Sequence, residues 1–358
     1  MKTKLFLFLL PLIIWGCSKN EPTTRSGSST PASAPAANAP SLLPQITMVE
    51  TPETKEQNQI KGQASTLLSS KDYKGLEDLA GKYRASKECY ADGLWKLTYV
   101  YIGIEPSDDA SESEWATRQS QVNDWIREQN ESITARVAKA RLLIGYAWKI
   151  RGSGWANSVK ETEWKKFHER LQQAVHVLEE SRALKEKCPV YWSSLQRAAL
   201  GLQTDKVEFE AVFNQAIKEY PDYWFYYQAR TTFLLPRWYG APGEWEKDLG
   251  ISADRIGSEN GDMLYAQVVW ASNLYGGGID IFEGHRISWG RVDKGFEVIL
   301  KQFPDSLAAK NERAYLAAQA GEKEKARNYF LLTKGQADLT AWEDKEAFDN
   351  FIKWAFTP

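Results

Sequence analysis

The side chains that most often carry metal or acid–base chemistry are few and scattered in this sequence. His168 and His176 lie on one predicted helix and His285 lies in a loop, and these are the three histidines of the chain. Two histidines that bind one metal ion from a helix normally stand four residues apart, whereas eight residues, or about 12 Å along the axis, separate this pair. No cysteine has a second Cys or His at ligand spacing. The sequence therefore predicts no metal site and no bound cofactor.

The glycine-rich and acidic stretches also lack the spacing of a catalytic motif. Gly152-Ser153-Gly154 has neither the Gly-x-Ser-x-Gly spacing nor the preceding strand of a serine nucleophile. Gly276-Gly277-Gly278 follows a predicted helix, which is typical of a helix end and not of a phosphate loop. The acidic run at residues 108–114 fits the negatively charged start of a helix, and a glycosidase carboxylate pair would have to be assembled across the fold. We identify no catalytic residue, and the sequence favours a binding protein over an enzyme.

Aromatic residues are the abundant candidates for binding. The chain has 15 Trp, 16 Tyr and 14 Phe, and residues 223–227 are five consecutive aromatic residues of which some must face away from the core. Trp and Tyr offer a large contact area with one polar atom at protein interfaces, and their rings also stack on sugars. In the simplest alternative the rings only fill gaps between helices. The candidate groove residues are Tyr223, Tyr226, Tyr227, Trp238, Trp289, Arg151 and Arg237.

The two arginines of this set admit two roles. Arg151 and Arg237 either contact an anionic ligand or cap the carboxyl ends of helices, where a cation satisfies the last carbonyl groups. Arg237 directly follows Pro236 at a predicted helix end. This position favours the cap for Arg237.

The elements that must position these residues are helices. Between residues 164 and 178, apolar residues recur in steps of three and four, which places them in one stripe along a helix with Lys, Glu and Gln opposite. No pair of alternating strands joined by a hairpin turn is found. The fold class is therefore predicted to be all-α. Similar helical patterns cover residues 73–83, 94–102, 122–129, 133–150, 207–220 and 295–303.

A degenerate repeat relates some of these helices. The motif that begins Cys188-Pro189 recurs 32 residues later as Tyr220-Pro221, and each proline is expected to begin a helix. Phe303-Pro304 begins a third unit, in which residues 307–320 and 322–332 form two helices joined at Gly321. This arrangement resembles the tetratricopeptide (TPR) repeat. The resemblance implies stacked antiparallel helix pairs, an α-solenoid with a concave side.

A longer stretch resembles one bacterial family. Residues 231–246 contain Leu-Leu-Pro-Arg-Trp at a helix end, and residues 151–154, 287–296 and 311–330 match further parts of the same pattern in order. The pattern is similar to that of the bacterial family catalogued as domain of unknown function 4034, and it covers about residues 70–345. The resemblance implies a helical, repeat-like fold and no settled activity.

The beginning of the chain resembles a bacterial lipoprotein signal. Lys2 and Lys4 precede an apolar run at residues 5–15, and Ile14-Trp15-Gly16-Cys17 resembles a lipobox, although Trp15 stands where a small residue is usual. This resemblance implies that the Cys17 thiol is lipidated after cleavage of residues 1–16, whereas an ordinary secretory signal is the alternative. Ser18 after the cysteine implies an outer-membrane lipoprotein that faces the periplasm. Attachment to the membrane is then through the lipid alone.

Three segments follow from these observations. Residues 1–16 are the predicted signal peptide, residues 17–46 the lipidated cysteine and a disordered tether rich in Ser, Pro and Ala, and residues 47–358 the helical repeat domain. In an oxidising compartment, Cys89 and Cys188 either form one disulfide or remain two buried thiols. The net charge, 45 − 47 = −2, argues against a nucleic-acid partner.

The predicted function is that of a scaffold in the cell envelope. A lipid-anchored helical-repeat protein without a catalytic motif is expected to bind a protein or peptide partner in a concave, aromatic-lined groove. The alternative is a binder of cell-wall glycan, or an enzyme acting on it, that uses exposed Trp and Tyr rings. A spacer without a dedicated ligand is the third reading.

Overall fold

The computed structural model describes residues 46–107, 109–152, 154, 156–275, 281–284, 286–342 and 345–357. In this part of the chain fifteen α-helices, one short 3-10 helix and two three-residue strands are present, which confirms the all-α prediction. No helix within these residues is long and apolar enough to cross a membrane. The predicted signal peptide, Cys17 and the tether up to residue 45 lie outside the described residues, as do Ser153, Gly276–278 and His285.

The elements follow one another with short connections. The bounds are β1 Thr47–Val49, α1 Pro52–Ser69, α2 Tyr73–Ser86, α3 Lys96–Ile104, α4 Glu112–Glu128, α5 Ile133–Arg151, a 3-10 helix at Ala156–Ser158, α6 Glu161–Ser181, α7 Pro189–Leu202, α8 Lys206–Glu219, α9 Phe225–Phe233, α10 Glu244–Ile256, α11 Ser258–Tyr275, α12 Trp289–Gln302, α13 Leu307–Gln319, α14 Lys323–Leu332, β2 Gln336–Asp338 and α15 Lys345–Phe356.

Local capping residues determine where many of these helices begin. At α4, the Ser111 side chain accepts a hydrogen bond from the Glu114 N–H, and the Glu114 carboxylate accepts one from the Ser111 N–H. Pro189 occupies the first turn of α7, as predicted. The expectation that Pro221 also begins a helix is wrong, because Pro221 lies in a turn and α9 begins only at Phe225. The third unit begins as predicted, since α13 starts at Leu307 and Ser306 caps it through the Ala309 N–H.

Helices that are close in sequence pack against each other. The strongest contacts join α5 to α6, α11 to α12, α1 to α3 and α13 to α14. On α6, Phe167, Leu171, Ala174 and Leu178 of the predicted stripe are buried, whereas Trp164 and Val175 are half-buried. At Gly295 a Cβ atom would lie 2.1 Å from the Asp262 carbonyl oxygen, so only glycine allows α12 to approach α11 so closely. The buried side chains form one apolar cluster that runs from Ile60 to Ala355.

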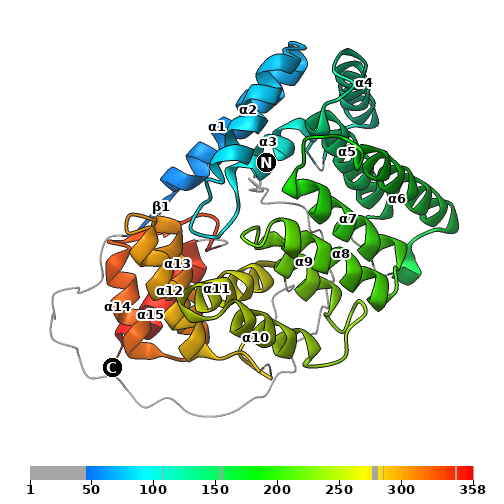
Figure 1. The fold of residues 1–358 in the computed structure, drawn as a ribbon. Coiled ribbons are helices and arrows are strands. Elements are labelled where there is room, and N and C mark those ends of the chain that lie inside the picture. Colours follow the sequence, from blue (N-terminus) through cyan, green and yellow to red (C-terminus); the bar gives the residue numbers. More distant parts are fainter. Residues whose placement is uncertain are drawn as a thin grey trace.

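The two ends of the described chain meet. β1 pairs in parallel with β2 in the register Thr47↔Gln336 and Val49↔Asp338, and Figure 1 shows α13 to α15 back beside β1 after the chain has passed through α4 to α11. Asn311 of α13 holds β2 against that helix, because its Oδ1 accepts hydrogen bonds from the Asp338 N–H and the Trp342 Nε1–H. We call the contact of β1, α1 and the α2–α3 loop with α13 and β2 the terminal junction. The strand pair was not predicted.

Candidate functional site

The aromatic run at residues 223–227 is part of the core. Each of its five side chains keeps no more than 9% of its surface exposed, so the expectation that some of them face away from the core is wrong. The Tyr226 hydroxyl donates to the Pro189 carbonyl oxygen at 2.7 Å, and the hydroxyls of Tyr223 and Thr98 lie 3.1 Å apart. The physical reason is that α9 contacts α7, α8, α10 and α11, so several of its faces are covered at once.

The remaining groove candidates lie in two other places. The Arg151 guanidinium stands 5.5 Å from the Trp148 and Trp164 rings and 6.0 Å from Trp238, and it donates to the carbonyl oxygens of Gly152 and Gly154. Arg151 therefore caps the end of α5, which is one of its two predicted roles. Arg237 lies in the turn after α9, where partial desolvation of its guanidinium group lowers its pKa.

Trp289 lies apart from all of these residues. It stands at the start of α12, where its ring is 6.1 Å from Phe282 and 5.7 Å from the Lys325 ammonium group. The seven candidates are therefore divided among the core around α9, the end of α5 with Trp238, and the start of α12. They do not converge on one surface.

The other sequence candidates are placed as separate side chains. Cys89 and Cys188 are both free, so the predicted alternative of one disulfide is not present. The Cys188 Sγ lies 3.3 Å from the Tyr101 hydroxyl, and burial raises the pKa of Cys89 to about 11. His168 stacks on Trp164 at 5.4 Å, whereas the His176 Nε2 lies 3.2 Å from Glu180 on the next turn of α6. Within the described residues, no group of three or more His, Cys, Asp or Glu side chains could hold a metal ion.

One cavity among the described residues is lined mainly by apolar side chains. It has a volume of about 420 Å³ and lies among the α2–α3 loop, the α8–α9 loop, α9, the end of α10, α11 and the end of α12. We call it the aromatic cavity. Its apolar lining is Trp95, Trp224, Tyr227, Ile256, Met263, Leu264 and Phe303, and its polar lining includes Asp222, Asn260, Gln267 and Gln302.

A smaller cavity adjoins the first and carries two carboxylates. It has a volume of about 40 Å³ and is lined by Asp92 of the α2–α3 loop, Glu312 of α13 and Trp270 of α11, among others. Trp224 and Gln267 line both cavities. Figure 1 shows the α2–α3 loop reaching down toward α11, and the Gln267 side chain holds it there by donating to the Ala91 carbonyl oxygen at 3.0 Å. We call this space the acidic cavity.

Burial dominates the electrostatics of the acidic cavity. Desolvation raises the pKa of Asp92 to about 7, although the Leu94 N–H donates to its carboxylate and opposes this rise. Glu312 keeps 7% of its surface exposed, and desolvation together with the charges of Asp92, Asp338 and Glu53 raises its pKa well above the ordinary value. Burial also raises the pKa of Asp338 to about 6. Both cavity carboxyl groups are therefore far easier to protonate than exposed ones.

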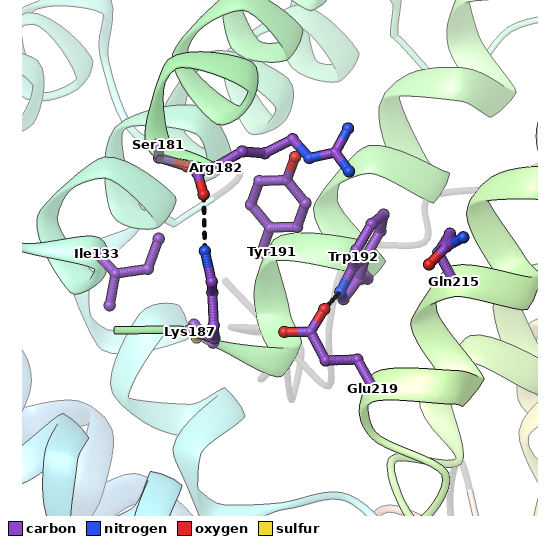
Figure 2. Close-up of a pocket in the computed structure, with 9 residues that line it drawn as sticks. Ile133, Ser181, Arg182, Lys187, Tyr191, Trp192, Gln215 and Glu219 are labelled. Carbon is purple, nitrogen blue, oxygen red and sulfur yellow. Dashed lines mark hydrogen bonds between the residues drawn. The ribbon is translucent and has the colours of Figure 1, made fainter. Parts of the chain in front are cut away.

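A third cavity, of about 210 Å³, lies between the end of α6 and helices α7 and α8. Figure 2 shows Arg182 and Lys187 on one side of it and Trp192 with Glu219 on the other. The Lys187 ammonium donates to the Arg182 carbonyl oxygen at 2.6 Å, and the Trp192 Nε1–H donates to Glu219 at 2.8 Å. Lys187, Trp192 and Glu219 are thus paired within the protein, and the Arg182 guanidinium lies 5.8 Å from the Trp192 ring.

Among the seven predicted groove residues, only Tyr227 lines the aromatic cavity. The lining comes from segments spread between Cys89 and Phe303, which no local motif connects. One signal was available for the acidic cavity. Glu312 stands three residues after Ala309 and four before Leu316, so a charged residue occupies the buried stripe of α13.

Comparison of the chain with protein-family models, with curated proteins and with solved structures finds no match. The resemblances to the TPR repeat and to the domain-of-unknown-function 4034 family therefore stay predictions from the sequence.

Proposed function

We propose that this protein is a lipid-anchored scaffold of the cell envelope, built of stacked antiparallel helix pairs, that binds a peptide segment of a partner protein in the aromatic cavity. The observation that carries the proposal is the lining of this cavity. Ligand pockets are commonly apolar with a few polar groups that fix orientation. Here Met263, Leu264 and Phe303 provide the apolar surface, and Asn260 and Gln302 provide amides that can pair with a peptide backbone.

The cavity suits an aliphatic or aromatic side chain better than a sugar. Sugar stacking needs an open ring face, but Trp95 and Trp224 keep only 3% and 7% of their surface exposed. Trp95 packs edge-on against Tyr223 at 5.3 Å, and the Lys87 ammonium lies 5.7 Å from its ring. The volume of about 420 Å³ has room for one or two large side chains. These contacts favour a peptide over the glycan alternative.

Filling the aromatic cavity should abolish peptide binding. The ligands are peptides from a random display library that are selected for binding to the immobilised full-length protein. Fluorescence polarisation then measures the Kd of each selected peptide. We expect Met263→Trp, which places a larger ring in the cavity, to raise the Kd at least tenfold, a loss of about 1.4 kcal/mol. The control Met263→Leu conserves volume and should stay within about twofold of the parent. Enrichment of no peptide, or equal Kd values for Met263→Trp and the parent, would contradict the proposal.

The anchor is tested separately at Cys17. We expect Cys17→Ala to shift the protein from the detergent phase to the aqueous phase after detergent partitioning, because several acyl chains bury about 0.8 kcal/mol per methylene in the membrane. Metabolic labelling with a radioactive fatty acid should mark the parent and not the variant. The matched control is Cys89→Ala, which should keep both the label and the detergent phase. A Cys17→Ala variant that remains labelled would reject the lipid anchor and leave the peptide site untouched.

A further inference from the structure

The acidic cavity places two carboxyl groups in the protein without a counter-charge. The charged groups that influence Asp92 and Glu312 are Glu53 on α1 and Asp338 on β2, together with the Asp92 charge itself, and all of them are acidic. Among the described ion pairs none includes Asp92 or Glu312, whereas the buried Asp293 is paired with Arg313 at 2.7 Å. Buried carboxylates are normally paired. A cation from outside the chain would provide the positive charge that these two carboxyl groups lack.

The walls of the acidic cavity fit a cation that is part of a larger molecule. The Trp224 and Trp270 rings line it, and aromatic rings attract ammonium groups through their quadrupole. Trp224 is 93% buried, since 7% of its surface is exposed, and its Nε1–H is buried with no hydrogen-bond partner. This N–H packs against Gly93, where an added Cβ would come within 1.9 Å of it, and Gly93 lines the aromatic cavity.

We propose that the acidic cavity binds the primary ammonium group of the peptide that occupies the aromatic cavity, with Asp92 and Glu312 as its charge partners and Trp224 and Trp270 as its walls. This inference rests on the proposed peptide-binding function and adds the chemistry that the peptide must carry. The peptide's apolar side chain fills the aromatic cavity, and its ammonium passes Trp224 and Gln267 into the acidic cavity.

The size of the acidic cavity supports this occupant. A cavity needs about 10–15 Å³ of such volume to hold one water molecule, so a volume of about 40 Å³ has room for an ammonium group with an adjoining methylene. A divalent metal ion is a weaker fit, because no group of three or more potential ligand side chains is present among the described residues. Gln228 and Thr340 provide further oxygen atoms around the ammonium.

The protonation of the carboxyl groups makes binding depend on pH. An ammonium group binds the ionised carboxylate, and Asp92 has a pKa of about 7 before it binds. Affinity should therefore rise as pH increases through about 7. A lysine side chain keeps its charge to about pH 10, whereas a peptide α-amine loses its charge near pH 8. Binding that persists at pH 9 identifies a lysyl ammonium, and binding that falls between pH 7.5 and pH 9 identifies an α-ammonium.

The test uses small probes with the full-length protein in detergent micelles. Ligand-observed NMR titrations at pH 6, 7.5 and 9 measure the Kd of Nα-acetyl-lysine amide and of leucine amide, with neutral Nα,Nε-diacetyl-lysine amide as the uncharged comparison. At pH 7.5 we expect one of the two ammonium probes to bind at least tenfold more tightly than the neutral probe. Glu312→Gln should raise the Kd of that ammonium probe at least tenfold. The control Glu208→Gln, on the exposed side of α8, should change it less than twofold.

Several outcomes would overturn the inference. Equal affinities for the charged and neutral probes would do so, as would an unchanged Kd in Glu312→Gln, or displacement of the probes by micromolar Ca²⁺. A selected peptide that loses binding in Met263→Trp but binds Glu312→Gln like the parent would reject the ammonium site and keep the proposed function. If Met263→Trp does not raise the Kd of any selected peptide, the proposed function itself is rejected. Unchanged far-UV circular dichroism and an unfolding midpoint no lower than the parent's show that Glu312→Gln is folded.

Discussion

Replacement of Asp293 by alanine should destabilise the protein by about 3–5 kcal/mol, because it removes the nearest charge partner of the buried Arg313 guanidinium and leaves it only Glu297, at 3.4 Å. The Asp293 carboxylate accepts hydrogen bonds from Arg313 at 2.7 and 2.9 Å, from the Lys325 ammonium at 2.7 Å and from the Tyr329 hydroxyl at 2.7 Å. Burial alone would raise the pKa of Asp293, but the bonds from Lys325, Tyr329 and Arg313 outweigh it and hold the pKa below its ordinary value. One side chain of α12 thus joins α13 and α14.

Urea denaturation at pH 7 measures this effect as a shift of the midpoint at constant slope. The matched control is Asp78→Ala, which breaks an exposed pair between Lys74 and Asp78 on α2 and should cost no more than about 0.5 kcal/mol. The double variant Asp293→Ala/Arg313→Met removes both charges and should recover part of the loss, since an apolar replacement of a buried pair is often tolerated. A loss in Asp293→Ala no larger than that in Asp78→Ala would show that the network contributes little.

The helices could be predicted from the sequence because their signal is local. On α6 every third or fourth residue is apolar, and the helix forms there with the same stripe buried. The strand pair carries no such signal. Thr47–Val49 and Gln336–Asp338 are three residues each and pair in parallel from opposite ends of the described chain, so neither a hairpin turn nor a long alternation marks them.

The aromatic run was misread for a related reason. The apolar periodicity of a helix predicts burial on the assumption that the opposite face of the helix meets solvent. This assumption fails for α9, because it contacts α7, α8, α10 and α11. Its rings are therefore core residues, although Trp224 and Tyr227 still line the aromatic cavity from inside. The binding site could not be predicted residue by residue, because Asp92 and Glu312 meet only when the terminal junction forms. Folding of the whole chain creates this site, and no segment contains it alone.

The same junction should make the folded state less stable as pH rises from about 4 to about 7. Burial raises the pKa of Asp92 to about 7 and that of Asp338 to about 6, and it raises that of Glu312 well above its ordinary value. In the unfolded chain these groups titrate near pH 4. Between these values the folded state holds protons that the unfolded state has released, so stability falls with increasing pH. Below about pH 4 the sign reverses, because Asp293, whose pKa is lowered in the folded state, must then be protonated.

Thermal unfolding between pH 3 and pH 8 should therefore show its highest midpoint in mildly acidic solution. Glu312→Gln keeps the shape of the side chain and removes one of the groups that bind a proton on folding, so the decline toward pH 7 should become shallower. Glu208→Gln on α8 should leave the parent profile unchanged. If Glu312→Gln declines as steeply as the parent, the proton uptake lies elsewhere. An ammonium ligand should oppose the decline, because it stabilises the ionised carboxylates, and adding it at pH 7.5 should raise the parent midpoint more than that of Glu312→Gln.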